Sequence, residues 1–177
     1  MKICMIGTGY VGLVSGTCFA DIGHQVYCVD KDLSKINQLN SGISPIYEPG
    51  LDELIKKNHK AKRLYFTSDL KKAITVSDII FICVGTPNIK GSLKVDLSFV
   101  FKCTKEILAI TKKKKIIVTK STVPIGTGDQ IENIIKKKKK LFSVISNPEF
   151  LREGEAIRDF RYPDRIIIGS NSKNEFK

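Results

Sequence analysis

The sequence has no tryptophan, only two histidines and two methionines, and no long uninterrupted hydrophobic run. A helix that spans a bilayer needs about 18 or more consecutive apolar residues. The apolar start, residues 1–16, is interrupted by four glycines, and no small-residue cleavage site follows it. We therefore expect neither a membrane span nor a signal peptide, and a protein that works in the cytoplasm.

The cysteines lack the pairing and spacing of a disulfide framework or a zinc site. There are five, an odd number, and none are spaced as C-x-x-C. Cys4, Cys28 and Cys83 lie within apolar, strand-like runs, where a thiol behaves as a small hydrophobic side chain. His24 and His59 have no partner at the spacing of metal ligands. We expect reduced thiols and no metal site.

Acidic residues are few relative to basic ones: 18 Asp and Glu stand against 30 Lys and Arg, for a net charge of +12. Two lysine blocks, residues 112–115 and 136–140, carry most of the excess, and each precedes an apolar run. This placement fits the exposed end of a helix, where lysines also suit the helix dipole. A polyanion site is the alternative, but few aromatic residues lie among these lysines. We expect no nucleic-acid partner.

Short apolar runs alternate with longer amphipathic segments along the 177 residues, a length that suits one domain with a hydrophobic core. We expect strands at residues 2–6, 25–29, 64–67, 78–84, 116–120, 142–146 and 166–168, and helices at residues 10–22, 33–39, 51–57, 69–73, 96–110 and 128–135. Continuous apolar strands between helices indicate a parallel sheet that is covered on both faces. The predicted fold class is α/β, a doubly wound, mainly parallel, Rossmann-like sheet.

Residues 7–12 read G-T-G-Y-V-G, directly after the first predicted strand and at the start of the first predicted helix. In this context Gly7 permits a tight turn, Gly9 lets a pyrophosphate approach the backbone, and Gly12 lets the helix pack close to the strand. The helix start adds free N–H groups and a positive dipole end, which favour phosphates. A plain strand–helix turn is the alternative for a lone match of this kind.

Asp30 ends the second predicted strand, 18 residues after Gly12. A carboxylate at this place accepts hydrogen bonds from the adenosine ribose and repels a 2′-phosphate, which favours NAD over NADP. Lys31 and Lys35 lie nearby in the sequence and soften this preference. The glycine turn and the acid together predict NAD as the cofactor, and with it hydride-transfer chemistry.

Polar motifs follow three more of the predicted strands, at residues 85–87 (GTP), 120–124 (KSTVP) and 147–154 (NPEFLREG). Open α/β sheets bind ligands at the carboxyl ends of their strands, so we expect the three loops to converge on one crevice. The alternative is that Thr-Pro and Asn-Pro merely form turns.

Two carboxylates in the last motif, Glu149 and Glu153, are four residues apart and share a face if the segment is helical. Near a nicotinamide, such a pair can orient a water, act as a base, or shift each other's pKa. Local ion pairs with Arg152 or Arg158 are the alternative.

The sequence resembles the UDP-glucose/GDP-mannose dehydrogenases nearly from end to end. The shared motifs are IGTGYVGLV from residue 6, VD at 29–30, PIYEPGL at 45–51, FICVGTP at 81–87, TKSTVPIGTG at 119–128, SNPEFLREG at 146–154 and PDRIIIG at 163–169. KSTVP, together with Gly154, favours UDP-glucose over GDP-mannose as the substrate. The resemblance implies an enzyme that oxidises the sugar C6 alcohol to a carboxylate in two NAD-dependent steps. The product, UDP-glucuronate, is then used in polysaccharide biosynthesis.

Position by position, the resemblance also implies a set of site residues. The residues that it implies to contact NAD are Gly7, Gly9, Tyr10, Val11, Gly12, Asp30, Lys35, Gly85, Thr86, Pro87, Ser121, Thr122 and Glu153. The residues that it implies to contact the sugar nucleotide are Glu149, Phe150, Leu151, Arg152 and Glu153. Thr122 and Glu149 are implied to hold a catalytic water or to serve as acid and base.

The sequence departs from the family in what it does not contain. Family members continue into a central helix and a second α/β domain that binds UDP and carries the nucleophilic Cys in a GxxCxPKD-like stretch. We interpret residues 1–177 as the NAD-binding domain, not competent alone, and the polar end from residue 170 as a domain boundary or a cut. Full-length members are expected to be homodimers. The alternatives are a dehydrogenase for GDP-mannose or UDP-N-acetylmannosamine, and a non-catalytic dinucleotide-binding module.

Overall fold

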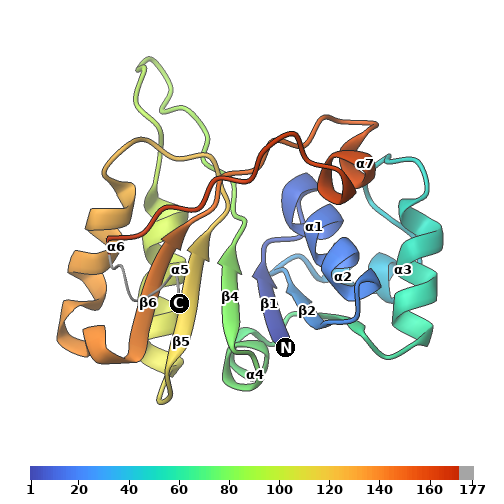
Figure 1. Ribbon diagram of the computed structural model, residues 1–177, viewed down its shortest axis with the longest axis horizontal. Coiled ribbons are helices and arrows are strands. Elements are labelled where there is room, and N and C mark those ends of the chain that lie inside the picture. Colours follow the sequence, from blue (N-terminus) through green and yellow to red (C-terminus); the bar gives the residue numbers. More distant parts are fainter. Residues whose placement is uncertain (172–177) are drawn as a thin grey trace.

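Figure 1 shows the computed structural model of the chain, in which residues 1–171 are described. Six strands form one sheet, in the order β3-β2-β1-β4-β5-β6. They are β1 (Lys2–Ile6), β2 (Gln25–Val29), β3 (Leu64–Thr67), β4 (Ile79–Ile82), β5 (Lys115–Thr119) and β6 (Phe142–Ser146). All pairs of neighbouring strands are parallel. The order and the direction of the strands confirm the doubly wound, Rossmann-like fold.

Helices cover both faces of the sheet (Figure 1). One face packs against α1 (Tyr10–Asp21), α2 (Leu33–Asn40), α3 (Leu51–Lys60) and α7 (Ala156–Arg161). The other face packs against α4 (Leu70–Val76), α5 (Ser98–Ile110) and α6 (Thr127–Ile135), and a 3-10 helix, Lys136–Leu141, follows α6. Most of these elements begin and end within three residues of the predicted bounds.

The alternation of side chains along β1 explains why the sheet needs two helical layers. Ile3 and Met5 pack into the cluster that contains α1, whereas Cys4 and Ile6 pack into the cluster that contains α4 and α5. All four side chains are buried. Because successive residues of a strand point to opposite faces, a strand that is covered on both sides is apolar throughout. The continuous apolar runs in the sequence follow from this arrangement.

All five cysteines are free thiols within the hydrophobic core. Burial raises the pKa of Cys103 to about 11 and the pKa of Cys18 and of Cys83 to about 12. These thiols are therefore protonated at neutral pH, and they pack as small apolar side chains.

The lysine blocks lie at the amino ends of β5 and β6, on the edge of the sheet opposite the carboxyl ends of the strands. Residues 112–114 and 136–140 are exposed, as expected. Lys115 is only 8% exposed, and its Nζ donates to the carbonyl oxygens of Thr75, at 3.3 Å, and Ser77. The expectation of an exposed side chain is therefore wrong at Lys115, whose ammonium binds the carbonyl groups at the end of α4.

The structure corrects the sequence-based prediction after β6. The strand expected at residues 166–168 does not form, and the three isoleucines there are exposed. An isolated antiparallel bridge between Ser146 and Gly169 takes its place. Conversely, the short helix α7 was not expected, because six residues give too little periodicity to recognise. The expected polar end, residues 170–177, lies for the most part outside the described residues.

Within residues 1–171, none of the helices has the length and hydrophobicity needed to cross a membrane. The longest of them, α5, has 13 residues, whereas a transmembrane helix takes about 20. In the same part of the chain, no group of three or more His, Cys, Asp or Glu side chains is placed to hold a metal ion.

Ile80 in β4 offers a direct test of the core, because its side chain is fully buried. We expect Ile80→Ala to lower the free energy of unfolding by about 2–5 kcal/mol, through lost burial and the cavity that it leaves. Urea denaturation measures the change. The matched control is Ile43→Ala, at a loop position whose side chain is 55% exposed, for which we expect a change within about 0.5 kcal/mol. Equal losses for the two variants would contradict the central place of β4.

Candidate functional site

The loops that follow the strands meet at one edge of the sheet, because all the strands run in the same direction. The chain order reverses between β1 and β4: β2 and β3 lie on one side of this point, and β5 and β6 on the other (Figure 1). Open α/β sheets bind their ligands outside such a switch point. The candidate site is therefore formed by the loops after β1, β2, β4, β5 and β6.

The glycine turn between β1 and α1 depends on the absence of side chains. Gly7 has a φ of 104°, and its N–H donates to the carbonyl oxygen of Val29 at 2.8 Å. A Cβ on Gly12 would lie 2.0 Å from the carbonyl oxygen of Gly7, so only glycine lets α1 start this close to β1. Gly9 precedes α1, no side chain caps the helix there, and a Cβ on Gly9 would meet nothing within 4 Å. The start of α1 therefore borders open space.

Asp30, directly after β2, holds this turn in place. Its Oδ2 accepts hydrogen bonds from the backbone N–H of Thr8 at 2.9 Å and from the Thr8 hydroxyl at 2.7 Å, and its Oδ1 accepts from the N–H of Asp32 at 3.1 Å. Burial raises the pKa of the Asp30 carboxyl, but these hydrogen bonds and the charge of Lys35 outweigh it, and the pKa lies below its ordinary value. Asp30 is thus a carboxylate at neutral pH, with capacity for a further donor.

The loops after β4 and β5 are tied to each other. The Ser121 hydroxyl donates to a main-chain carbonyl just after β4 at 2.7 Å, and the Thr86 hydroxyl donates to the carbonyl oxygen of Thr122 at 2.9 Å. Gly85, Pro87 and Thr122 are exposed, whereas Ser121 is buried. The structure therefore brings these five predicted residues together at the same edge of the sheet.

A buried lysine joins the loops after β5 and β6. Lys120 is 7% exposed, and its Nζ donates to Oδ1 of Asn147 at 3.2 Å, while Nδ2 of Asn147 donates to the carbonyl oxygen of Ile167 at 2.9 Å. Burial lowers the pKa of Lys120, and the nearby Cys83 and Glu149 act to raise it. Neither Lys120 nor Asn147 is among the predicted site residues. The sequence feature that could have indicated a role is their position, since each is the first residue after its strand, β5 or β6.

The segment of residues 147–155 forms no helix. Oε2 of Glu149 accepts a hydrogen bond from the N–H of Leu151 at 2.6 Å, and Gly154 has a φ of 86°. The condition under which Glu149 and Glu153 would share a helical face is therefore not met, because the backbone turns here and α7 starts after both. Leu151 packs against the core, whereas Phe150 and Glu153 are exposed.

The two glutamates do not pair with the arginines proposed as alternative partners. Nη2 of Arg152 lies 2.7 Å from Oδ1 of Asp159, and Nη1 of Arg158 lies 3.6 Å from Oε2 of Glu155. The hydrogen bonds from Arg152 lower the pKa of Asp159 to about 2. The first contact holds the segment against α7, and neither of these two ion pairs includes Glu149 or Glu153.

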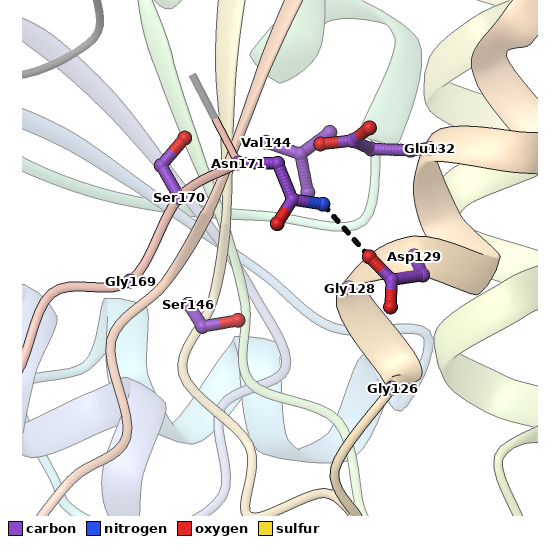
Figure 2. A pocket seen from close by; sticks show the side chains of 9 residues that line it. All are labelled: Gly126, Gly128, Asp129, Glu132, Val144, Ser146, Gly169, Ser170 and Asn171. Carbon is purple, nitrogen blue, oxygen red and sulfur yellow. Dashed lines mark hydrogen bonds between the residues drawn. The ribbon is translucent and has the colours of Figure 1, made fainter. Parts of the chain in front are cut away.

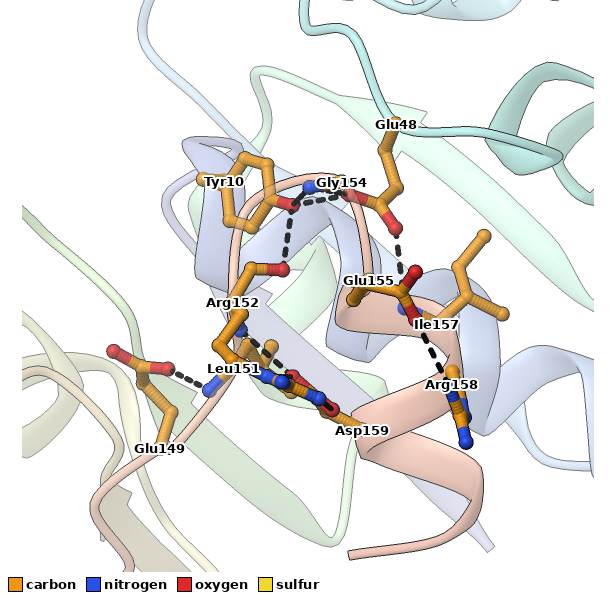
Figure 3. A network of polar contacts seen from close by, with 10 residues as sticks. All are labelled: Tyr10, Glu48, Glu149, Leu151, Arg152, Gly154, Glu155, Ile157, Arg158 and Asp159. Atoms are coloured by element: carbon orange, nitrogen blue, oxygen red, sulfur yellow. Dashed lines mark hydrogen bonds and ion pairs between the residues drawn. The ribbon is translucent and has the colours of Figure 1, made fainter.

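A polar network joins the first residue of α1 to this segment (Figure 3). Glu48 is 6% exposed, and its Oε2 accepts hydrogen bonds from the Tyr10 hydroxyl and from the N–H of Gly154 at 2.8 Å. Its Oε1 accepts from the N–H of Ile157 at 3.3 Å. The Tyr10 hydroxyl also lies 3.3 Å from the carbonyl oxygen of Arg152 and 3.0 Å from the nitrogen of Gly154. We call these five residues the Glu48 network.

The Glu48 network was not foreseen in the sequence. Tyr10 was expected to contact the cofactor, whereas its hydroxyl lies within this network. Burial, followed by the hydrogen bond to Glu48, raises the pKa of Tyr10 to about 12, so the hydroxyl keeps its proton at neutral pH. The sequence feature that could have pointed to Glu48 is its position in the PIYEPGL motif.

A separate cavity of about 330 Å³ lies at the β6 edge, between the start of α6 and residues 169–171 (Figure 2). Asp129, Glu132 and Ser146 line it, and Nδ2 of Asn171 donates to Oδ1 of Asp129 at 2.7 Å. None of the predicted site residues lines this cavity. It is therefore distinct from the candidate site.

The residues at the switch point fit a dinucleotide. The uncapped start of α1 offers N–H groups to phosphates, the space before Gly9 is open, and the carboxylate of Asp30 stands at the end of the neighbouring strand. The fold and this site define a Rossmann-type dinucleotide-binding domain. Over residues 1–177 the chain matches the NAD binding domain of the UDP-glucose/GDP-mannose dehydrogenase family, and it belongs to that family. The expected family and the expected cofactor, NAD, are confirmed.

Several curated relatives are UDP-glucose 6-dehydrogenases. The protein of Rhizobium meliloti (strain 1021) is 57% identical over 171 residues, and TuaD of Bacillus subtilis (strain 168) is 53% identical over 174 residues. These alignments include 96% and 97% of this chain, but 39% and 38% of the relatives. The chain thus spans less than half the length of the curated relatives that it matches.

Solved structures of the family have the same fold. A ternary complex of GDP-mannose dehydrogenase from Pseudomonas aeruginosa has a TM-score of 0.93 and 38% identity, over 98% of this chain and 42% of that one. UDP-glucose dehydrogenase from Pyrobaculum islandicum has a TM-score of 0.89 and 37% identity, over 97% of this chain and 41% of that one. The similarity extends over nearly the whole of this chain.

The second and third glycines of the candidate phosphate site, Gly9 and Gly12, should respond differently to an added methyl group. In Gly12→Ala the Cβ collides with the carbonyl of Gly7, and we expect a loss of about 1–3 kcal/mol of stability together with weaker NAD binding. In Gly9→Ala the Cβ meets no protein atom, so we expect stability within about 0.5 kcal/mol of the original and NAD binding at least about 10-fold weaker. Thermal melting and calorimetric titration measure the two effects. Undiminished NAD binding by Gly9→Ala would contradict the phosphate site.

Proposed function

We propose that this chain is the NAD-binding part of an enzyme that oxidises UDP-glucose to UDP-glucuronate. The observation that carries the proposal is the Asp30 carboxylate, hydrogen-bonded to Thr8 in the glycine turn at the switch point of the sheet. There, Gly7, Gly9 and Gly12 let the pyrophosphate approach the start of α1. Asp30 accepts from the adenosine ribose and repels a 2′-phosphate, so NAD is preferred over NADP.

The other cofactor contacts belong to the first turns of α1 and α2 and to loops at the same edge of the sheet. We assign them to Tyr10, Val11, Lys35, Gly85, Thr86, Pro87, Ser121, Thr122 and Glu153. The hydrogen bond from Thr86 to the main chain of Thr122 supports this assignment, since it holds two of these loops in a fixed relation. The sugar-nucleotide contacts belong to Glu149, Phe150, Leu151, Arg152 and Glu153.

Oxidation of an alcohol removes a hydride from carbon and a proton from oxygen. NAD accepts the hydride when it is bound. In this proposal Glu149 takes the proton through a water that it holds together with Thr122. One oxygen of Glu149 accepts from Leu151, which orients the carboxylate and leaves the other oxygen for the water. Thr86 fixes the main chain of Thr122 and so sets the place of its hydroxyl.

The second oxidation requires a cysteine nucleophile, as the family resemblance implies. All five cysteines of this chain are buried, and burial raises the pKa of Cys83, the one at the site edge of the sheet, to about 12. A reactive thiolate is therefore not supplied by these residues. We propose that the nucleophile, the central helix and the UDP-binding domain belong to the rest of a full-length protein, and that residues 1–177 are not competent alone.

The choice of UDP-glucose rests on the relatives. UDP-glucose 6-dehydrogenases are 57% and 53% identical to this chain, whereas the GDP-mannose dehydrogenase structure is 38% identical. A cytoplasmic location is part of the proposal and is supported by the five unpaired thiols, which fit a reducing compartment. A role in polysaccharide biosynthesis and homodimerisation of the full-length protein belong to it as well, and rest on the family resemblance.

Removing the Asp30 carboxylate tests the cofactor site. We expect Asp30→Ala to weaken NAD binding by about 1–3 kcal/mol, because the ribose loses its acceptor and the glycine turn loses its support. Calorimetric titration of the chain with NAD and with NADP measures this and the preference between the two. The matched control is Asp69→Ala, which removes the carboxylate that caps α4 and should leave NAD affinity unchanged. Equal NAD affinity before and after the change at Asp30 would remove it from the site.

Replacing Glu149 tests the proposed chemistry. In a full-length protein that contains this domain, we expect Glu149→Gln to lower kcat with UDP-glucose by about 10²–10⁴-fold, because the amide cannot take the proton. NAD affinity should stay within about twofold, since Glu149 acts on the substrate side. Steady-state rates and NAD titration of the same preparation measure both. Full activity of the variant would refute a proton-accepting role.

A further inference from the structure

The Glu48 network holds the main chain on both sides of Glu153. The carbonyl oxygen of Arg152, just before Glu153, lies 3.3 Å from the Tyr10 hydroxyl. The N–H of Gly154, just after it, donates to Oε2 of Glu48 at 2.8 Å and lies 3.0 Å from the Tyr10 hydroxyl. The side chain of Glu153 itself is exposed. The network thus fixes the backbone from which Glu153 projects.

The burial of Glu48 makes this arrangement specific. A carboxylate that is 6% exposed requires hydrogen bonds, since burying an unpaired charge is strongly unfavourable. Three donors meet the requirement: the Tyr10 hydroxyl, the N–H of Gly154 and the N–H of Ile157. Because Tyr10 is the first residue of α1, the carboxylate connects the segment before α7 to the end of the glycine turn (Figure 3).

Other contacts dock α7 on α1 without Glu48. The rings of Phe19 and Phe160 meet edge to face with their centroids 5.0 Å apart, and Nη2 of Arg161 lies 2.9 Å from Oδ2 of Asp21. These two helices are therefore held together by contacts outside the Glu48 network as well. Loss of the network should therefore mainly loosen the backbone on both sides of Glu153.

We propose that Glu48 is a positioning residue of the cofactor site, which sets the place of Glu153 relative to the glycine turn through Tyr10 and Gly154. The inference rests on the proposed function, in which Glu153 contacts NAD. Glu48 itself touches no ligand in this proposal. It acts on NAD binding through the main chain of a residue more than a hundred positions away in the sequence.

A double-mutant cycle on NAD affinity tests the inference. Glu48→Gln keeps the size of the side chain but replaces one of its acceptor oxygens with an NH₂ group. This group cannot accept a hydrogen bond from the N–H or O–H donor that it faces. By calorimetric titration we expect this change to weaken NAD binding about 5–20-fold in the unmodified chain and less than about twofold when Glu153 is already alanine. The matched control is Glu155→Gln, an exposed carboxylate of the same segment outside the network, which should leave NAD affinity unchanged.

Equal losses from Glu48→Gln in both backgrounds would overturn the inference, because Glu48 would then act independently of Glu153. Undiminished NAD binding by Glu153→Ala would also overturn it, while Asp30→Ala still reports separately on the proposed function. Failure of the unmodified chain to bind NAD would instead overturn the proposed function. If Glu48→Gln does not fold, Tyr10→Phe, which removes the hydroxyl alone, replaces it in the cycle.

Hydrogen exchange gives a second readout that needs no ligand. We expect the amide of Gly154 to exchange at least about 10-fold faster in Glu48→Gln than in the unmodified chain, with no change in Glu155→Gln. Unchanged protection of this amide would show that Glu48 does not hold the segment, and the inference would fail.

Discussion

The two hydrogen bonds from Thr8 to the Asp30 carboxylate hold the turn on which the rest of the site depends. Thr8 lies between Gly7 and Gly9, so its fixed main chain sets the path from β1 into α1. The close approach of Gly12 to the carbonyl of Gly7 then brings the start of α1 to the edge of the sheet. The same turn therefore serves both the candidate phosphate site and the packing of α1 against β1.

Charged side chains differ in burial between the two edges of the sheet. At the carboxyl edge several polar side chains are buried or half-buried and have defined partners, as Asp30, Lys120 and Glu48 show. At the amino edge the lysines of residues 112–114 and 136–140 are exposed. The net charge of +12 therefore says little about the site, because much of it lies on the opposite edge. Lys115 departs from this division because carbonyl groups at the end of α4 offer its ammonium a partner.

Features that depend on neighbouring residues could be predicted from the sequence. Apolar runs located the six strands, and the spacing from the glycine turn to Asp30 located the cofactor edge. The predictions went wrong where local pattern and tertiary packing disagree. Residues 166–168 are as apolar as a buried strand, yet no second layer covers them among the described residues. The spacing of Glu149 and Glu153 suits a helix, but Gly154 adopts a positive φ and α7 starts beyond it.

The Glu48 network shows the limit of such prediction in physical terms. Its hydrogen bond from Gly154 joins residues 106 positions apart, and neither residue belongs to a periodic pattern. A lone glutamate in a loop resembles any solvated carboxylate until the fold surrounds it, so burial, which gives Glu48 its importance, has no signature in the sequence. The consequence extends to the site as a whole. The backbone of Tyr10 is part of the glycine turn, and its hydroxyl is hydrogen-bonded within the Glu48 network, so the glycine turn and the segment before α7 are directly connected.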